Sequence, residues 1–527
     1  MMTTRERPVF ALMLGAVLTW GCASQAPAGA TPAAGVPQPA AHPEQALIDD
    51  LVLAYRMFAK ELKVLDTAAH VSVRSQRDPS HFYMSRYLAP GAATASDIIE
   101  HDRDSRVVAG RPADQAARET HLHGQIYQAR PDVMAIVHAH TPEFIAYGMS
   151  SVPLWDGASR VPVWDIRPYN EGRSGTVQTP ALGRAMAAGL GDSHAVLLWG
   201  HGVAVTAASL PELVARTADL RDSARLQMGV IAMGGTWTPE TRPTEPAVIQ
   251  QTWAHLKQRV TDEAGGHIPT TQPPAPPPAA NPIEAAKRNL VLANRIMATE
   301  EVRVLSSFGH VSVRSPTDPN RYFVVPGIAA DLVTAGDIVE RNLTDSASPV
   351  PGLSIHEEVY KARPDVMAVV YAETPEVVML SKSPFRLRPI GIPYWDERDG
   401  FVVFDLGRLD RGQSMLTNPA LGRGIAEALK DNKSIGVLLP GQGFVVTGRS
   451  LAAVTNQAYS LRMSALIQQQ AIALRGKVAY LDDPPPPLAP NANPGTPPWP
   501  AGAFPDGQPA GEGRDWVYWR QMYAPAR

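Results

Sequence analysis

The chain has 527 residues, too many for one ordinary domain, and its 48 basic and 51 acidic residues leave a formal net charge of −3. This balance, with 44% hydrophobic residues, excludes both the basic surface of a typical nucleic-acid binder and the low apolar content of a disordered protein. The single cysteine excludes an intrachain disulfide and a cysteine-based zinc or iron–sulfur site. The 50 prolines, about twice the ordinary usage, indicate long linkers.

The N-terminus has the pattern of an export signal. Arg5 and Arg7 precede the apolar run Val9–Trp20, which is too short to cross a membrane, and Gly21-Cys22 follows. We therefore expect residues 1–22 to direct export to the periplasm. Gly21-Cys22 resembles the end of a bacterial lipobox, which implies that Cys22 is lipidated and anchors the protein to a membrane. The alternative is an ordinary cleaved signal with an incidental cysteine.

Proline-rich segments divide the rest of the chain. The predicted linkers are 23–43, 263–282 and 483–513. They separate two segments of domain size, 44–262 and 283–482, from an aromatic C-terminal segment, 514–527. We expect the aromatic segment to dock on the core or on an interface. The alternative is that Tyr518 or Tyr523 reaches an active site as a proton donor.

The two domain-sized segments repeat each other. The motif His70-Val-Ser-Val-Arg-Ser75 recurs as His310-Val-Ser-Val-Arg-Ser315, and Arg130-Pro-Asp-Val-Met-Ala135 recurs as Arg363-Pro-Asp-Val-Met-Ala368. Long identities in the same order indicate a tandem duplication. Because the repeat period far exceeds 50 residues, the chain is a two-domain tandem and not a solenoid.

The first copy alternates helical and strand patterns. Apolar spacing and β-rich runs predict a helix at Ala46–Lys60, a strand at Val71–Val73, a helix start at Thr94, a helix at Glu119–Arg130, a strand at Met134–His138, a helix at Pro180–Leu190, a strand at Ala195–Trp199 and a helix at Leu210–Gln227. This alternation predicts a layered α/β/α domain.

Three histidines of the first copy are candidate metal ligands. In a strand, His138 and His140 point to the same face, while Val137 and Ala139 point into the core. His201 is the candidate third donor, because the glycines on both sides of it permit close approach to an ion. Three neutral imidazoles suit a divalent metal and leave positions open for substrate, as in a catalytic site. The alternative is that His138 and His140 bind no metal and lie on a strand face that is exposed to solvent.

A glutamate precedes the histidine strand. Glu119 and His123 are four residues apart on the predicted helix and therefore share one face. Because this helix runs directly into the histidine strand, Glu119 is a candidate proton shuttle beside the metal. The alternative is an ordinary surface glutamate. His70 recurs as His310, so it serves either the shared fold or catalysis.

The ordered motif set resembles the class II aldolase/adducin family. It consists of Glu119–Asp132, then His138-Ala-His140, then Gly200-His-Gly202, and the resemblance covers nearly the whole of each copy. It implies that each copy is an α/β/α domain, a mainly antiparallel sheet flanked by helices, in an oligomer with sites between subunits. It also implies that the three histidines bind Zn²⁺, or alternatively Mn²⁺ or Fe²⁺, and that Glu119 is the catalytic acid/base.

The chain departs from the sugar-phosphate aldolases that it resembles. Those proteins carry Gly-Asn-x-Ser where this sequence has Ala69-His70-Val71-Ser72, so the asparagine that helps to hold phosphate is missing. His70, Ser72, Ser85 and Arg86 remain candidate substrate contacts. Arg86 is expected to meet a carboxylate or phosphate, with a surface cation as the alternative. Because the protein is predicted to be exported, we do not expect a phosphorylated substrate.

The second copy lacks the candidate metal ligands. The two strand histidines of the first copy are replaced by Tyr371 and Glu373, His201 by Gln442, and Glu119 by Gly352. Of the chemical groups compared, only His123 is retained, as His356. Tyrosine, glutamate and glutamine form a poor zinc set. We therefore expect a structural or interface role for this copy, and we expect two chains to form a four-domain assembly.

With the metal-ligand pattern of the first copy, the family resemblance implies a metal-dependent C–C lyase that acts on a small molecule. The predicted reaction is aldolase-type cleavage of a hydroxy-carbonyl compound through a metal-stabilised enediolate. The first alternative is a metal-dependent decarboxylase of a hydroxylated organic or aromatic acid. The second is a non-catalytic, adducin-like binding or scaffold protein. We expect a homo-oligomer with no nucleic-acid partner and with membrane contact only through the lipid anchor.

Overall fold

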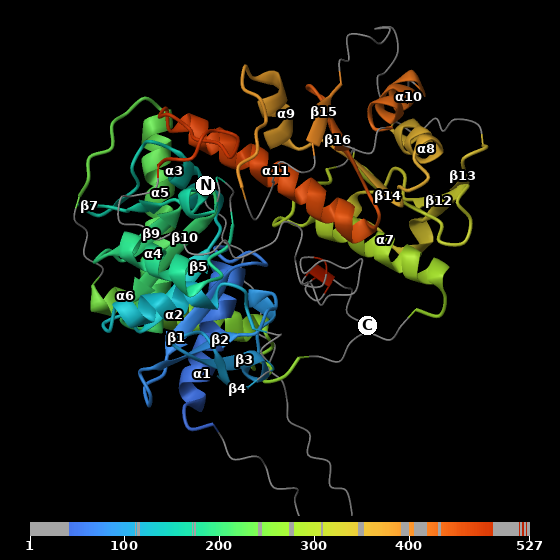
Figure 1. Cartoon of the computed structure of the whole chain (residues 1–527). Coiled ribbons are helices and arrows are strands. Elements are labelled where there is room, and N and C mark those ends of the chain that lie inside the picture. The colour runs from blue at the N-terminus through green and yellow to red at the C-terminus, as the bar shows by residue number, and fades with distance from the viewer. Residues whose placement is uncertain are drawn as a thin grey trace, which may run out of the picture. The chain divides into compact units, whose positions relative to one another are not determined.

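The computed structural model describes most of the chain beyond residue 41 (Figure 1). It describes residues 42–487, 516, 519, 520 and 523, apart from 111, 113–115, 171, 173–174, 241–244, 273–278, 307–308, 346–351, 392–399, 405–418 and 431–433. The predicted export signal with Cys22 lies outside the described residues, as does Tyr518. No helix of the described part of the chain has both the length and the apolar character needed to cross a membrane.

The first domain is built on one large sheet. The strand order is β4-β3-β2-β1-β5-β10-β9-β8, and the described pairings are antiparallel except that of β8 with β9. The strands of this sheet are β1 (His70–Arg74), β2 (His81–Ser85), β3 (Ile98–Asp102), β4 (Val107–Ala109), β5 (Ala135–Ala139), β8 (Val163–Trp164), β9 (Ala195–Leu198) and β10 (Gly202–Ala207). A separate pair is formed by β6 (Trp155–Asp156) and β7 (Ser159–Arg160).

Helices cover both faces of this sheet. Because side chains alternate along a strand, Val71 and Val137 belong to one hydrophobic cluster, while Ile136 and Ala204 belong to a second cluster on the opposite face. The helices are α1 (Gln45–Arg56), α2 (Thr120–Ala129), α3 (Pro142–Met149), α4 (Pro180–Leu190), α5 (Leu210–Ala232) and α6 (Pro246–Glu263). Helices α1, α3 and α5 pack on the first face, and α2 and α4 lie side by side on the second (Figure 1).

The second domain repeats this architecture. Its strand order is β13-β12-β11-β14-β17-β16-β15, with β15 and β16 parallel. Its elements are α7 (Pro282–Ala298), β11 (His310–Arg314), β12 (Arg321–Val324), β13 (Val339–Asn342), α8 (Leu353–Ala362), β14 (Ala368–Ala372), α9 (Pro375–Lys382), β15 (Gly400–Val403), α10 (Pro419–Ala428), β16 (Ser434–Leu439), β17 (Gly443–Gly448) and α11 (Leu451–Ala473). The register repeats as well, because His310 pairs with Tyr371 as His70 pairs with His138. The predicted fold class, two α/β/α domains around mainly antiparallel sheets, is confirmed.

The helix that was predicted to start at Thr94 is much shorter than expected. Thr94 and Asp97 do form a capping box, but the helix is a single 3₁₀ turn, Ala95–Asp97, because β3 begins at the next residue. At the C-terminal end, Trp516 and Trp519 are buried in the core of the second domain, as expected. The Tyr523 hydroxyl donates to a carboxylate oxygen of Glu301 at 2.8 Å.

Candidate metal centre

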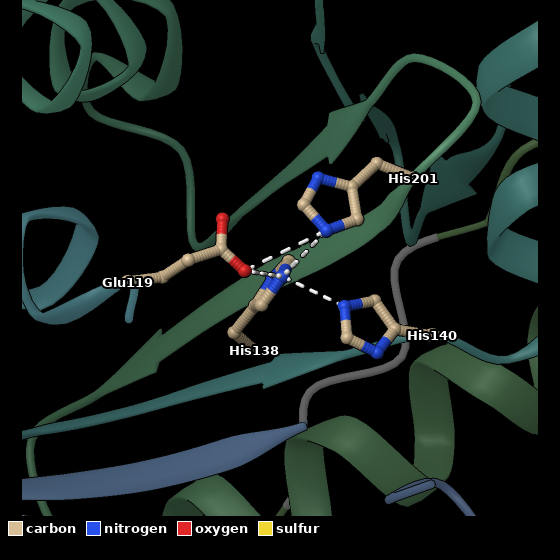
Figure 2. Close-up of side chains that lie close together, drawn as sticks. All are labelled: Glu119, His138, His140 and His201. Atoms are coloured by element: carbon tan, nitrogen blue, oxygen red, sulfur yellow. Dashed lines mark hydrogen bonds and ion pairs between the residues drawn. The ribbon is translucent and has the colours of Figure 1, made fainter. Parts of the chain in front are cut away.

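The three candidate histidines come from adjacent strands of the first sheet. β5 carries His138 and ends one residue before His140, and the turn between β9 and β10 carries His201. β10 pairs with β5 in a register that sets Val203 opposite Ala139. The turn with His201 therefore lies beside the end of β5. Figure 2 shows the three rings converging with the carboxylate of Glu119.

The four side chains offer one compact set of ligand atoms, all within 4.8 Å of one another. Nε2 of His138 lies 2.9 Å from Nε2 of His140 and 3.4 Å from Nε2 of His201. Oε2 of Glu119 lies 3.4 Å and 3.6 Å from the Nε2 atoms of His138 and His201. None of the four residues is more than 4% exposed. Among the described residues, this is the one group of three or more such side chains that could hold a metal ion.

The hydrogen bonds around the rings favour a cation between them. His138 Nδ1 lies 3.0 Å from the carbonyl oxygen of Val203, and His140 Nδ1 lies 2.9 Å from Oδ1 of Asp66, so each Nδ1 carries the proton. The two Nε2 atoms, which face each other, are then the ring atoms on the side of the cluster. Burial lowers the pKa of His201 to about 3, so the His201 ring is neutral at pH 7. Zn–N bonds of about 2.0–2.1 Å in a tetrahedral site place ligand nitrogens about 3.3 Å apart, so the donor set fits a divalent ion.

Glu119 is held at the cluster by the backbone. The sequence pattern predicts a helix that begins at Glu119, whereas α2 begins at Thr120 and Glu119 is the residue before it, with φ −101° and ψ 31°. The amide of Val177 donates to Oε1 at 2.7 Å, which leaves Oε2 on the side of the histidines. Burial alone would raise the pKa of Glu119, but the neighbouring His201 and His138 outweigh it and hold this pKa well below its usual range.

His123 is linked to Glu119 through His70 and not by a direct contact. Its Nε2 is 2.7 Å from Nδ1 of His70, and its Nδ1 is 2.6 Å from the hydroxyl of Ser72, which in turn is 2.8 Å from the hydroxyl of Tyr127. Nε2 of His70 approaches Oε2 of Glu119 at 3.9 Å. A catalytic role for His123 stays a prediction, and in this geometry it acts through His70.

The second domain keeps the same buried network. His310 Nδ1 lies 2.8 Å from His356 Nε2, and the Ser312 hydroxyl lies 2.7 Å from His356 Nδ1 and 2.8 Å from the hydroxyl of Tyr360. Because this copy lacks the histidine cluster, the network does not depend on a metal. We infer that it stabilises the shared fold, and that His70 is the member of the first network that also borders the candidate metal centre.

Two further candidate substrate residues lie at the end of β2. The backbone amide of Ser85 donates to the Tyr55 hydroxyl at 3.2 Å, and the residue is buried. Nε of Arg86 donates to Oδ1 of the buried Asp97 at 2.7 Å. This ion pair occupies one edge of the guanidinium group. The predicted substrate contacts of Ser85 and Arg86, like that of the buried Ser72, stay predictions.

Asp66 was missed by the sequence analysis. Its Oδ1 accepts hydrogen bonds from the amides of Ala68 and Ala69, both at 2.9 Å, as well as from His140. The local turn thus holds the carboxylate that orients a candidate metal ligand. The two side chains are 74 residues apart in the chain, so no spacing pattern could connect them.

We expect Asp66→Asn to weaken metal binding while the fold is retained. Asparagine keeps an oxygen at the same place but loses the charge that makes His140 a stronger donor, so the metal affinity should fall about tenfold or more. Competition with a chelator measures the change. Asp104→Asn, at an exposed position, is the control and should bind metal as the wild type does. Unchanged affinity in Asp66→Asn would contradict the orienting role.

The second domain cannot hold a metal in the same place. The Tyr371 hydroxyl donates to the carboxylate of Glu373, and the backbone oxygen of Gln442 lies 3.0 Å from the same hydroxyl. Gly352 has a φ of 82°, and a Cβ there would lie 2.5 Å from Nε2 of His310. A side chain at the position equivalent to Glu119 therefore does not fit without rearrangement, so the site has lost both its ligands and the space for its carboxylate.

Residues of the second domain border the turn that carries His201. A Cβ on Gly200 would lie 2.5 Å from the carbonyl oxygen of Ile390, so only glycine permits this close approach. Arg167 stacks on Trp199 and donates to the carbonyl oxygen of Tyr480 at 3.1 Å. These contacts agree with a structural role for the second copy beside the candidate metal centre.

Comparisons with known proteins identify the family. The profile of the "Class II Aldolase and Adducin N-terminal domain" matches residues 49–228 and 288–469. The chain belongs to the class II aldolase and adducin family. Both domains are members of this family, and the profile matches contain the candidate metal centre of the first domain and the altered site of the second.

Several known proteins are similar to parts of the chain. Decarboxylase tropJ of Talaromyces stipitatus is 33% identical over 187 residues, which are 31% of this chain and 69% of that protein. The 3,4-dihydroxyphthalate decarboxylase of Rhodococcus jostii is 30% identical over 130 residues, 23% of this chain and 52% of that enzyme. Alpha-adducin of Mus musculus is 27% identical over 209 residues, 36% of this chain and 26% of that protein. The solved L-fuculose 1-phosphate aldolase from Glaciozyma antarctica is 21% identical with a TM-score of 0.35, covering 42% of this chain and 90% of that one.

Proposed function

We propose that the first domain is a metal-dependent lyase that cleaves a C–C bond of a small hydroxylated compound. The convergence of three imidazoles and one carboxylate in a buried site supports this proposal. His138, His140 and His201 would hold a divalent ion, with Zn²⁺ as the first candidate and Mn²⁺ or Fe²⁺ as alternatives. When bound, such an ion polarises a substrate oxygen and stabilises the negative charge that bond cleavage leaves on the substrate.

Glu119 would move the proton in this reaction. Its low pKa keeps the carboxyl ionised at neutral pH, and the Val177 amide fixes Oε1, so Oε2 is the oxygen available to take up and return a proton. His70 borders the same oxygen at 3.9 Å and would orient it. The burial of the cluster keeps water away from a reactive carbanion.

The first candidate reaction is aldol-type cleavage of a hydroxy-carbonyl compound, which releases an aldehyde. The second candidate is decarboxylation of a hydroxylated organic or aromatic acid, which releases carbon dioxide from the same kind of intermediate. Similarity to two proteins named as decarboxylases favours the second candidate. Similarity to alpha-adducin suggests a third candidate function, that of a non-catalytic scaffold. A scaffold function does not explain why four buried side chains that could bind a metal converge in one cluster.

Product analysis separates these functions. The metal-loaded protein is incubated with panels of hydroxy-carbonyl compounds and hydroxybenzoic acids, and the release of aldehyde and of carbon dioxide is measured. The chelator-treated protein serves as the control. Metal-dependent aldehyde release supports the aldolase, and metal-dependent carbon dioxide release supports the decarboxylase. A protein that binds no metal after exposure to zinc or manganese would contradict the lyase and favour a scaffold.

We further propose that the protein is exported to the periplasm and anchored through a lipid on Cys22. The short apolar run Val9–Trp20 and the Gly21-Cys22 pair support this proposal. In bacterial cells, Cys22→Ser is expected to abolish labelling by radioactive palmitate and to move the protein from the membrane to the soluble fraction. Ser24→Ala is the control. Membrane association that survives Cys22→Ser would contradict the lipid anchor.

A further inference from the structure

His201 differs from the other two histidines in what orients its ring. Nδ1 of His138 is hydrogen-bonded to the carbonyl oxygen of Val203, and Nδ1 of His140 is hydrogen-bonded to Asp66. Among the described residues, Nδ1 of His201 has no such partner. A hydrogen bond at the second ring nitrogen normally fixes the orientation of a metal-binding imidazole. The orientation of the His201 ring therefore depends on the backbone turn that carries it (Figure 2).

The second copy holds the equivalent turn with one of its own side chains. The hydroxyl of Ser381, in α9, accepts a hydrogen bond from the amide of Gly441 at 3.2 Å. Gly441 and Gly200 are the first glycines of the two aligned turns. Because α3 and α9 each have eight residues and begin with proline, Gly148 takes the position of Ser381 in the first domain. The first domain thus has no side chain at the position from which the second copy holds its turn.

Two segments of the second domain contact the turn of the first domain instead. The carbonyl oxygen of Ile390 lies so close to Gly200 that a Cβ on this glycine would be 2.5 Å from it. The carbonyl oxygen of Tyr480 accepts a hydrogen bond from Nη1 of Arg167 at 3.1 Å, and the guanidinium group of Arg167 lies 3.5 Å from the ring centre of Trp199. These four side chains are at most 8% exposed, so the contacts are shielded from water.

The two segments, 388–390 and 480–483, are bound to each other, and together we call them the clasp. The amide of Leu481 donates to the carbonyl oxygen of Pro389 at 3.1 Å. The guanidinium group of Arg388 lies 4.1 Å from the ring centre of the tyrosine in the second segment and forms ion pairs with two aspartates of that segment. A planar group that stacks and forms ion pairs at once fixes the geometry of its partners. A shift of one segment therefore moves the other.

We propose that the second domain positions His201 for metal binding through the clasp. This role rests on the proposed function, because it concerns the metal centre of the first domain. Ile390 restricts the movement of Gly200, and Arg167, which is bound to the clasp, fixes the ring of Trp199. Both restrained residues directly precede His201, so its ring is directed at the other ligands without a hydrogen bond at Nδ1. Arg167 is a positioning residue, because it acts on His201 through Trp199.

Competition with a chelator, applied to the full chain, tests the positioning role. Arg167→Lys keeps a positive charge beside Asp165 but loses the planar group that stacks on Trp199, so the Kd for Zn²⁺ should rise about 10- to 100-fold. The visible absorption spectrum of the Co²⁺-loaded protein should change as well, because it reports the geometry of the ligands. Arg160→Lys is the control, since Arg160 is an exposed arginine over the ring of Trp155, and it should bind metal as the wild type does.

A variant in the second domain tests the clasp itself. Arg388→Ala removes the link between the two segments at a side chain that is 33% exposed, and it should raise the Kd for Zn²⁺ about tenfold. In a chain that already carries Arg167→Lys, it should have little further effect, because both changes act through the same turn. Arg321→Ala is the matched control, since it removes ion pairs with Asp318 and Glu340 at the surface of the same domain.

The outcomes separate this role from the lyase activity. A wild-type chain that binds no metal would overturn both. Metal binding in the wild type with unchanged affinity in Arg388→Ala would overturn the clasp and leave the lyase in place, even if Arg167→Lys fails to fold. Fully additive losses in the double variant, or an equal loss in Arg321→Ala, would also overturn the clasp. A raised Kd in both single variants without additivity, at an unchanged circular dichroism spectrum, would support it.

Discussion

Replacing His201 by alanine is expected to remove the divalent ion from the protein. The wild-type chain should carry about one ion, because the described residues contain one suitable cluster. His201 supplies one of the three imidazole nitrogens, and its loss opens the site. A bound ion contributes several kcal/mol of stabilisation to the charge that develops in the reaction. Because about 1.4 kcal/mol corresponds to a tenfold change in rate, lyase activity should fall about a thousandfold or more. Elemental analysis and product assays measure both effects.

The internal repeat supplies a matched control for this variant. Gln442 occupies the position of His201 in the second domain, within the same glycine-flanked turn. Gln442→Ala should keep one ion per chain and wild-type activity, because the second site lacks the other ligands. Metal loss in Gln442→Ala would show that an alanine in this type of turn disturbs the protein in general, so the metal loss in His201→Ala could not be assigned to the missing imidazole. Metal retained in His201→Ala would contradict the assignment of the site.

Much of the candidate site could be predicted because its residues follow local rules. Strand alternation alone places His138 and His140 on one face, and glycines on both sides mark His201 as a special turn position. The duplication adds a second line of reasoning, since the second copy changes all three of these residues together. The sequence does not show that the turn and the end of β5 are neighbours. That proximity depends on the pairing of β10 with β5, which is set by the packing of the whole sheet.

The details that the sequence did not show depend on tertiary contacts. Helical spacing predicts that Glu119 begins the helix, whereas it stands one residue before α2, and the Val177 amide accounts for the side of the carboxylate that faces the histidines. His123 is drawn into a buried network with His70 and Ser72. Asp66 had no sequence signal, because it reaches His140 from a loop 74 residues away. Periodicity describes one element at a time and carries no information about such contacts.

Replacing Glu119 by glutamine is expected to separate the proton-transfer step from metal binding. Glutamine keeps an oxygen that accepts the hydrogen bond from the Val177 amide, so the local structure should be retained. It cannot take up a proton at neutral pH, and general acid–base catalysis typically contributes about 10²- to 10⁴-fold to the rate. We expect kcat to fall by about that factor while the metal content stays near one ion per chain.

Glu143→Gln is the control, because Glu143 is a buried carboxylate that is not one of the four clustered side chains. Glu143 is 5% exposed and accepts a hydrogen bond from Nε of Arg225 at 2.6 Å. This exchange also removes a buried negative charge from the first domain, so it reproduces any general effect of that loss on the fold. Its kcat should remain near that of the wild type. If Glu119→Gln instead loses the ion, Glu119 is a metal ligand and the proton must move through another group. His70, whose Nε2 lies 3.9 Å from Oε2 of Glu119, is then the candidate.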